Sequence, residues 1–212
     1  MRRGPTGLVA VATVAAALLT GCGQEPEQVP GQAAPITAPT TAPGTATATG
    51  PTGSPTVSAP PVPTSFGPFE VTAHGVTARL PVPTGWTRTR NEIPARLNTD
   101  LTVPEVPGLV LRIDVIPRGA ESVRAGVLAL ERTADIADYR RTDLSDVPGV
   151  GEDAVDWSFT STYQGIACRT VNRQLALGPG GVAVLFRAPI GLFDRYRPVW
   201  ERAVADLTVV LG

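Results

Sequence analysis

The sequence has no lysine, a single histidine and only two cysteines among its 212 residues. Because every basic residue is an arginine, Schiff-base chemistry and catalysis by a lysine base are excluded. A Ser-His-Asp triad would need His74 as its base, and catalytic zinc usually takes two or three imidazole or thiolate ligands. We therefore expect no metal site, no cofactor and no catalytic residue. An enzyme whose serine and carboxylate groups are brought together only by the fold is a distant alternative.

The chain also carries little net charge, with a formal value of −1. From residue 66 onward, 16 arginines stand against 17 acidic side chains. A nucleic-acid-binding domain would show a basic excess. The near balance therefore argues against a nucleic-acid partner and, more weakly, against electrostatic docking on anionic lipid.

Long hydrophobic runs are absent as well. Residues 8–19 form an apolar run of about a dozen residues, whereas a transmembrane helix takes about 20. Two arginines precede the run, which indicates a secretory signal peptide over residues 1–21. Because the small residues Thr20 and Gly21 lead directly into Cys22, the segment resembles a bacterial lipobox.

That resemblance implies that Cys22 becomes the first mature residue and carries a diacylglyceryl group and a further acyl chain such as palmitate. The protein would then be exported and anchored by lipid at the outer face of the cytoplasmic membrane. The alternative is an ordinary signal peptide followed by a cysteine that is there by chance.

Aromatic residues are missing before Phe66. Between residues 23 and 65, Pro, Thr, Ala and Gly supply 31 of 43 residues, and only Glu25 and Glu27 are charged. Such a composition cannot bury enough apolar surface to fold, so we expect a disordered tether over 22–65, which could carry O-linked glycans. The remaining 66–212 are long enough for a single domain.

Within that domain, alternating apolar residues and short turns predict an α+β fold, in which helices pack on an antiparallel β-sheet. Residues 87–105 show no clear strand pattern. Two amphipathic helices are expected, over 122–134 and 192–207, with Pro198 inside the second. The strands are expected over 69–73, 76–80, 109–116, 139–144, 154–163, 166–177 and 182–187.

The order of these elements resembles the PsbP-like fold of actinobacterial lipoproteins of the LpqN and LpqT type. The Pro-x-Gly-Trp step from Pro83 to Trp86 and the terminal helix that bears Trp200 carry the resemblance, which covers about residues 69–210. It implies an α/β/α sandwich at the cell surface with a role in binding or scaffolding. The absence of lysine and the richness in Ala, Gly, Pro and Val also point to a GC-rich, actinobacterial genome.

Several residues that could carry chemistry have simpler interpretations. His74 adjoins Gly75 in an expected hairpin turn, and Cys168 lies on an expected strand, which favours a buried inert thiol over a reactive one. The glycines of 149–151 and 178–181 are expected to form turns. A solvated edge is favoured over a cation site or a glycosidase pair for seven acidic residues: Asp135, Asp138, Asp143, Asp146, Glu152, Asp153 and Asp156.

Three residues are the candidates for ligand binding. Trp86 follows an irregular break and could be exposed, whereas Trp157 and Trp200 are expected in the core. Arg187 and Arg195 could flank an anionic headgroup or a partner surface. We therefore expect a non-enzymatic accessory protein that binds an envelope protein or an amphiphilic lipid or glycan. A pure protein-interaction scaffold is the alternative, and an exposed apolar patch would distinguish it.

Overall fold

The computed structural model describes residues 59–93 and 96–212. The expected signal peptide, Cys22 and most of the expected tether lie outside this range. The described residues form, in chain order, β1 (Phe66–Ala73), β2 (Val76–Pro83), β3 (Thr87–Ile93), β4 (Arg96–Thr102), β5 (Val110–Pro117), α1 (Val123–Thr133), β6 (Arg140–Asp146), β7 (Asp153–Tyr163), β8 (Ile166–Leu177), β9 (Gly180–Pro189), α2 (Ile190–Ala205) and β10 (Thr208–Leu211).

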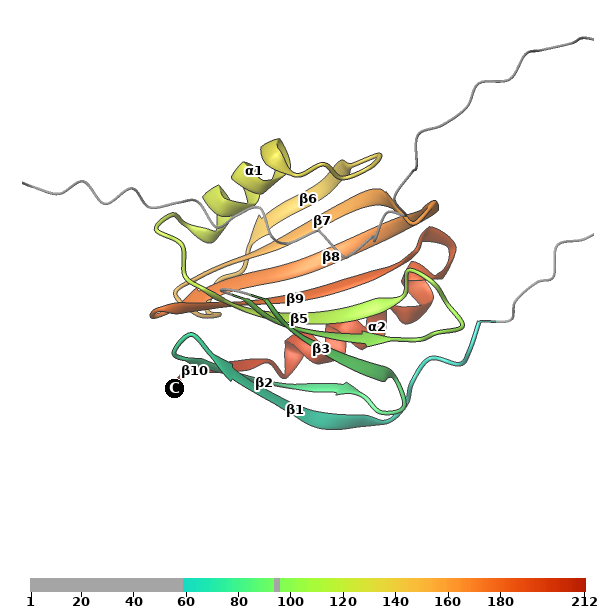
Figure 1. The fold of residues 1–212 in the computed structure, drawn as a ribbon, viewed down its shortest axis with the longest axis horizontal. Coiled ribbons are helices and arrows are strands. Elements are labelled where there is room, and N and C mark those ends of the chain that lie inside the picture. The colour runs from blue at the N-terminus through green and yellow to red at the C-terminus, as the bar shows by residue number, and fades with distance from the viewer. Residues whose placement is uncertain (1–58, 94–95) are drawn as a thin grey trace, which may run out of the picture. The chain divides into compact units, whose positions relative to one another are not determined.

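Two antiparallel sheets contain these strands (Figure 1). The large sheet has the order β3-β4-β5-β9-β8-β7-β6, and the small sheet has the order β1-β2-β10. The β1–β2 and β7–β8 hairpins close through two-residue turns, at His74-Gly75 and Gln164-Gly165, in which both residues have positive φ. This geometry suits the right-handed twist of the paired strands. The expected turn at His74-Gly75 is therefore confirmed, and Gln164-Gly165 fills the two-residue gap between the strands expected over 154–163 and 166–177.

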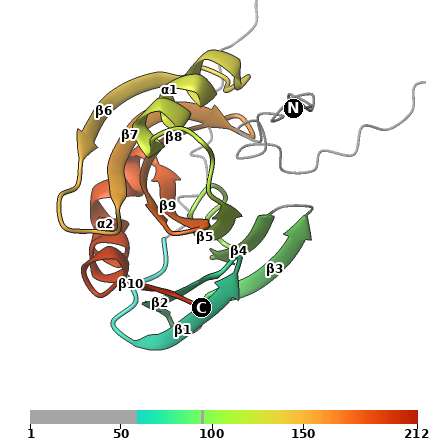
Figure 2. The ribbon, with the colours of Figure 1, turned by 90° about the vertical axis from the view of Figure 1, so that its left-hand side faces the viewer.

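The two helices pack on opposite faces of the large sheet (Figure 2). Helix α1 buries Val127 and Leu130 against the aromatic side chains of β7. Its first turn is capped twice, since the Ser122 hydroxyl accepts from the Ala125 amide at 3.2 Å and Asp153 accepts from the Val123 amide at 2.6 Å. Such caps satisfy amides that no helical carbonyl can reach.

Helix α2 and the small sheet share the other face of the large sheet. The helix buries Phe193, Tyr196 and Trp200, and the Trp200 indole donates to the Val184 carbonyl at 3.2 Å. The main core is formed by this face of the large sheet, by the helix and by the small sheet. The α+β class and the α/β/α layering are thus confirmed, with the addition that the strands divide into two sheets.

Two expectations about the elements need correction. The stretch 87–105, which shows no strand pattern in the sequence, contains β3 and β4. Every residue of β3 is exposed, because it is the edge strand, so no apolar alternation marks it. The terminal helix ends at Ala205 rather than Leu207, and the chain continues into β10, which pairs with β2.

Candidate functional site

The candidate site is the face of the large sheet that points away from α2, which we call the polar face. Residues directly opposite each other in antiparallel strands share a face, so the register defines its members. They are Arg96, Asn98 and Asp100 of β4, Arg112 and Asp114 of β5, Arg187 of β9, and Thr170, Asn172 and Gln174 of β8. The same face continues to β7, where α1 packs on Val155, Trp157 and Phe159.

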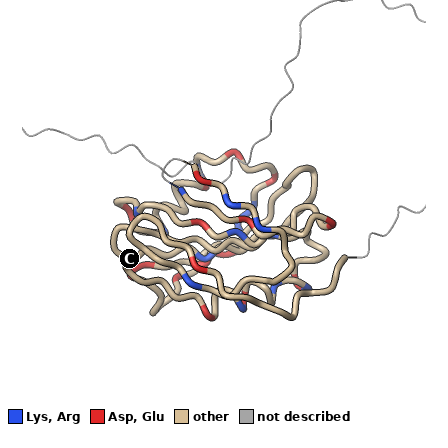
Figure 3. Tube along the Cα trace, turned by 60° about the horizontal axis from the view of Figure 1, so that its bottom comes forward, with Lys and Arg blue, Asp and Glu red and all other residues tan. Residues whose placement is uncertain are grey.

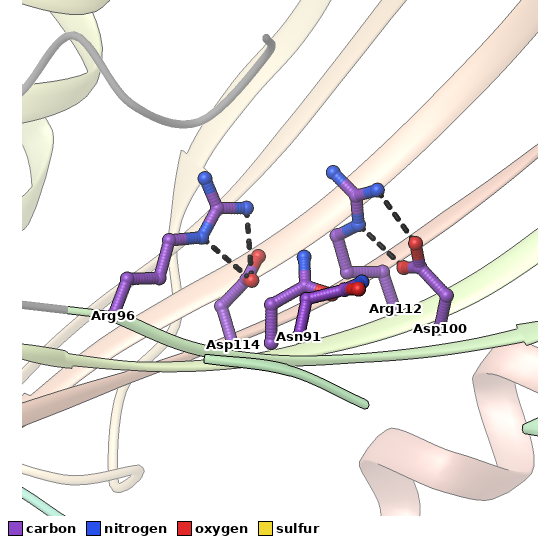
Figure 4. A network of polar contacts seen from close by, with 6 residues as sticks. Asn91, Arg96, Asp100, Arg112 and Asp114 are labelled. Atoms are coloured by element: carbon purple, nitrogen blue, oxygen red, sulfur yellow. Dashed lines mark hydrogen bonds and ion pairs between the residues drawn. The ribbon is translucent and has the colours of Figure 1, made fainter. Parts of the chain in front are cut away.

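Two ion pairs between β4 and β5 organise one half of the polar face (Figure 4). Arg112 donates from Nε and Nη2 to the two oxygens of Asp100, at 2.6 and 2.8 Å, which is a bidentate pair. Arg96 donates from Nε to Oδ1 of Asp114 at 2.9 Å, and its Nη2 lies at the same distance from that oxygen as an ion-pair contact. The side chains of Arg96 and Asp114 are only 5% and 1% exposed. Between the pairs, the Asn91 amide of β3 donates to the Asn98 oxygen at 3.2 Å.

Burial and neighbouring charges shift the pKa values of Asp114 and Arg112. Burial by itself raises the pKa of Asp114, and the positive charges of Arg96 and Arg112 counteract part of that rise. Burial acts to lower the pKa of Arg112, but the hydrogen bond and charge of Asp100 outweigh it, and the net pKa is raised. Arg112 is therefore held as a cation by a carboxylate of the same face.

Strand β8 supplies polar groups that have no partner. Thr170, Asn172 and Gln174 alternate along the strand and are 1%, 2% and 9% exposed. The Thr170 hydroxyl, the Asn172 amide oxygen and the Gln174 amide nitrogen make no hydrogen bond. Leaving a buried polar atom unpaired costs about 1–3 kcal/mol, so three on neighbouring positions of one strand need an explanation.

Arg187 of β9 lies directly opposite Thr170. Its guanidinium carbon stacks over the Tyr163 ring at 3.4 Å from the centroid, and its buried Nε has no hydrogen-bond partner. Within the part of the chain that the structure describes, no carboxylate lies within ion-pair distance of Arg187. Burial lowers the pKa of Arg187, and the charge of Arg112 adds to this, while Tyr163 and Cys168 oppose it. A desolvated ion costs several kcal/mol, and stacking on an aromatic ring in a desolvated position offsets about 2 kcal/mol or more of that cost.

A second candidate is an open hollow of about 560 Å³ between the small sheet and the end of α2. Phe66, Phe69 and Leu80 contribute apolar walls. Its charged side chains are paired with each other, since Arg79 contacts Glu70 at 2.6 Å and Arg202 contacts Asp206 at 3.1 Å. The hollow therefore has less unsatisfied binding capacity than the polar face.

The three residues that the sequence singled out for ligand binding do not form one site. Trp86 is partly buried and packs against the main core, so it is not the exposed platform that the irregular loop suggested. Arg195 is exposed on α2 and donates to the Pro60 carbonyl at 3.0 Å. Arg187 points to the opposite face of the large sheet, because its neighbour Phe186 packs on Phe193 of α2.

The other sequence candidates are structural. Cys168 is fully buried as expected, and burial raises the pKa of its thiol. Most of the acidic run pairs with arginines or caps backbone amides; for example, Asp156 forms a bidentate pair with Arg173, at 2.8 and 2.7 Å. Among the described residues, no three His, Cys, Asp or Glu side chains converge as metal ligands. No described helix has the length and apolar character needed to cross a bilayer.

Sequence reasoning missed the polar face, although a signal for it exists. Polar residues alternate at 96, 98 and 100, at 112 and 114, and at 170, 172 and 174. Alternation alone usually marks a solvent-exposed strand face. That these side chains are buried, and which ones meet, depends on the strand register. Over the described trace as a whole, basic and acidic positions are interspersed rather than separated by sign (Figure 3).

Comparisons with known proteins bear on the fold. No family model matches the sequence, and no curated protein matches it. The structure is similar to the solution structure of cyanobacterial PsbP from Synechocystis sp. PCC 6803, with a TM-score of 0.52 at 7% identity over 69% of this chain and 93% of that one. It is less similar to LpqN, involved in cell envelope biogenesis of Mycobacterium tuberculosis, with a TM-score of 0.47 at 14% identity over 68% and 91%. The first likeness confirms that the chain has a PsbP-like fold.

Proposed function

We propose that this protein is an exported, lipid-anchored and non-enzymatic binding protein of the cell envelope, whose ligand binds on the polar face of the large sheet. Cys22, at the lipobox-like end of the apolar run, is the proposed site of the anchor. The Pro- and Thr-rich stretch after it is the proposed tether that holds the binding domain away from the membrane.

The observation that carries the proposal is the unpaired polar row on β8. Thr170, Asn172 and Gln174 are buried, and each has an unpaired polar atom. On the same face, beyond β9, the charged side chains of β4 and β5 are held in place by ion pairs. A binding site has this composition, because a few fixed polar groups orient a ligand that completes their hydrogen bonds. A surface selected for stability alone would place apolar side chains there instead.

The scaffold alternative has less support. It predicts a contiguous exposed apolar patch, but the large hydrophobic side chains exposed in the described part of the chain are Ile93, Ile190, Val210 and Leu211, which come from three different elements. The enzyme alternative needs a nucleophile hydrogen-bonded to a base. Among the described residues, His74 lies in the β1–β2 turn, and its side chain forms no hydrogen bond with a serine.

The anchor is tested by fractionation of the full-length chain. Cys22→Ser should move the protein from the membrane pellet to the supernatant, because the thiol is the attachment point of the lipid. Mass spectrometry of the wild-type N-terminus should detect an acylated Cys22. An unmodified mature N-terminus at another residue would contradict the anchoring.

The binding function is tested by purifying the full-length protein under native conditions and identifying co-purifying small molecules by mass spectrometry. Asn172→Leu combined with Gln174→Leu removes two unpaired amides and should abolish recovery of the ligand. Arg195→Gln, on the opposite side of the sheet, is the matched control and should retain it. A ligand that the double variant still binds would show that the polar face is not the binding site. A co-purifying protein that is lost only when Ile93 or Leu211 is changed would favour the alternative of a protein-interaction scaffold.

A further inference from the structure

We infer that the ligand of the polar face carries an anionic oxyacid group, a carboxylate or a phosphate, which binds the guanidinium of Arg187 beside Thr170. This inference rests on the proposed function and specifies the ligand's chemistry. From the sequence, Arg187 and Arg195 are both possible anion contacts, whereas the structure separates the two and gives Arg187 different neighbours.

The charge balance of the polar face is the first argument. Arg96 pairs with Asp114, and Arg112 pairs with Asp100. In the described part of the chain, Arg187 is the remaining charged residue of this face, and no carboxylate lies within ion-pair distance of it. The face therefore carries one uncompensated positive charge in a partly desolvated position.

The neighbours of Arg187 do not supply the missing negative charge. Burial raises the pKa of the Cys168 thiol, which keeps the thiol protonated at neutral pH. Tyr163 offers the face of its ring and a side-chain hydrogen bond, but it is not a carboxylate. Arg112, which is itself a cation, adds repulsion. An anion brought by a ligand would be attracted by both guanidinium groups.

The geometry of Arg187 leaves part of its donor edge without an acceptor. A ring stacked on the flat face of a guanidinium occupies neither of the edges that carry the N–H groups. The Nε atom has no acceptor, and the Thr170 hydroxyl, directly across from Arg187 on β8, is also unpartnered. Planar N–H groups on one edge match the two oxygens of a carboxylate or phosphate, and a hydroxyl can donate to the same group.

The rest of the β8 row suggests what adjoins the anion. Asn172 follows Thr170 on the same face at a distance of about 7 Å, two residues along an extended strand. Its amide oxygen needs a donor. The ligand should therefore carry a hydroxyl or amide N–H group next to its anionic end.

The test compares three probes with one carbon skeleton: glycerol 3-phosphate, glycerate and glycerol. Thermal unfolding and calorimetric titration are measured on the full-length protein purified in detergent. We expect at least one anionic probe to bind saturably and to raise the midpoint by about 5 °C at 100 times its Kd, and glycerol to have no effect. Arg187→Gln should weaken that binding at least tenfold, whereas Arg195→Gln, an exposed arginine on α2, should not change it.

The other possible outcomes bear either on the inferred anion or on the proposed function. Equal loss in both arginine variants, or binding unchanged in Arg187→Gln, would overturn the inference, and so would a wild-type protein that binds neither anion. If Arg187→Gln does not fold, Thr170→Val replaces it and should also weaken binding of the anion. The native ligand could lack an anionic group and still be lost from the Asn172→Leu and Gln174→Leu double variant. That result would overturn the inference that the ligand is anionic, but the proposed function would stand. Retention of the native ligand by that double variant would overturn the proposed function itself.

Discussion

Strands β4 and β5 have two faces that are both largely buried and chemically opposite. Toward α2 they present apolar side chains, including Leu97, Leu101, Leu111, Ile113 and Val115, which belong to the main core. Away from α2 they present Arg96, Asn98, Asp100, Arg112 and Asp114. The apolar face is explained by the area that it removes from water. The polar face needs another reason, because burying ion pairs rarely adds net stability over apolar packing.

The proposed function accounts for that difference. The apolar face stabilises the domain. The polar face keeps side chains in place with paired charges and leaves some atoms unsatisfied, a condition that stability alone would not favour. The comparison can be tested by changing residues on each face in turn.

The largest effect is expected from breaking the buried pair on the polar face. Asp114→Leu should reduce the free energy of unfolding by about 4 kcal/mol, because it removes one partner of a buried ion pair, the carboxylate that contacts Arg96. Chemical denaturation monitored by tryptophan fluorescence measures this. The double variant with Arg96→Met should recover most of the loss. A double variant as unstable as the single one would show that shape, rather than charge compensation, governs this position.

On the opposite face of the same strand, Leu111→Ala should cost about 3 kcal/mol, through lost burial and the cavity left behind. The same denaturation experiment measures it. Unlike the ion pair, this loss should have no single compensating partner substitution. A change below about 1 kcal/mol would mean that the core relaxes around the cavity and that this face is less tightly packed than its burial implies.

A smaller effect of opposite sign is expected at Asn172. Asn172→Leu should leave stability unchanged or raise it by about 1 kcal/mol, because it removes a buried unpaired amide oxygen and adds apolar contact. Differential scanning calorimetry measures the shift. A loss of more than about 1 kcal/mol would show that the amide is structural, and the contrast between the two faces would lose its functional meaning.

The smallest effect is expected from an exposed ion pair, which can be compared with the buried ion pairs. Glu152 accepts from Arg118 and, at 3.1 Å, from the Gly178 amide, and these hydrogen bonds lower the pKa of Glu152. Because the pKa is lower in the folded state, the stabilisation is present above the usual glutamate value and is lost as pH falls through the folded value. The difference in unfolding midpoint between wild type and Glu152→Gln should therefore shrink as the pH is lowered from 7 to about 3. A difference independent of pH would exclude the ionised pair as its source.

Much of the fold could be predicted from local signals. The hairpin turns at 74–75 and 164–165, the strands that flank them and both helices follow from turn residues and periodicity, which act over a few positions. Strand β3 could not be predicted, because an exposed edge strand has no apolar alternation. Strand β10 was hidden by the apolar pattern that continues from α2, since helix and strand are hard to tell apart in short runs.

The sequence by itself determined what chemistry is excluded, namely lysine catalysis and multi-histidine metal binding, and it determined the α+β class and the buried state of Cys168. Only the tertiary structure decided which charges meet. Arg96 and Asp114 are 18 residues apart and pair through the β4–β5 register, while Arg187 lies across from Thr170 and no described carboxylate reaches it. The physical reason is that a one-residue slip in register would move each side chain to the other face, and local sequence does not determine register between distant strands.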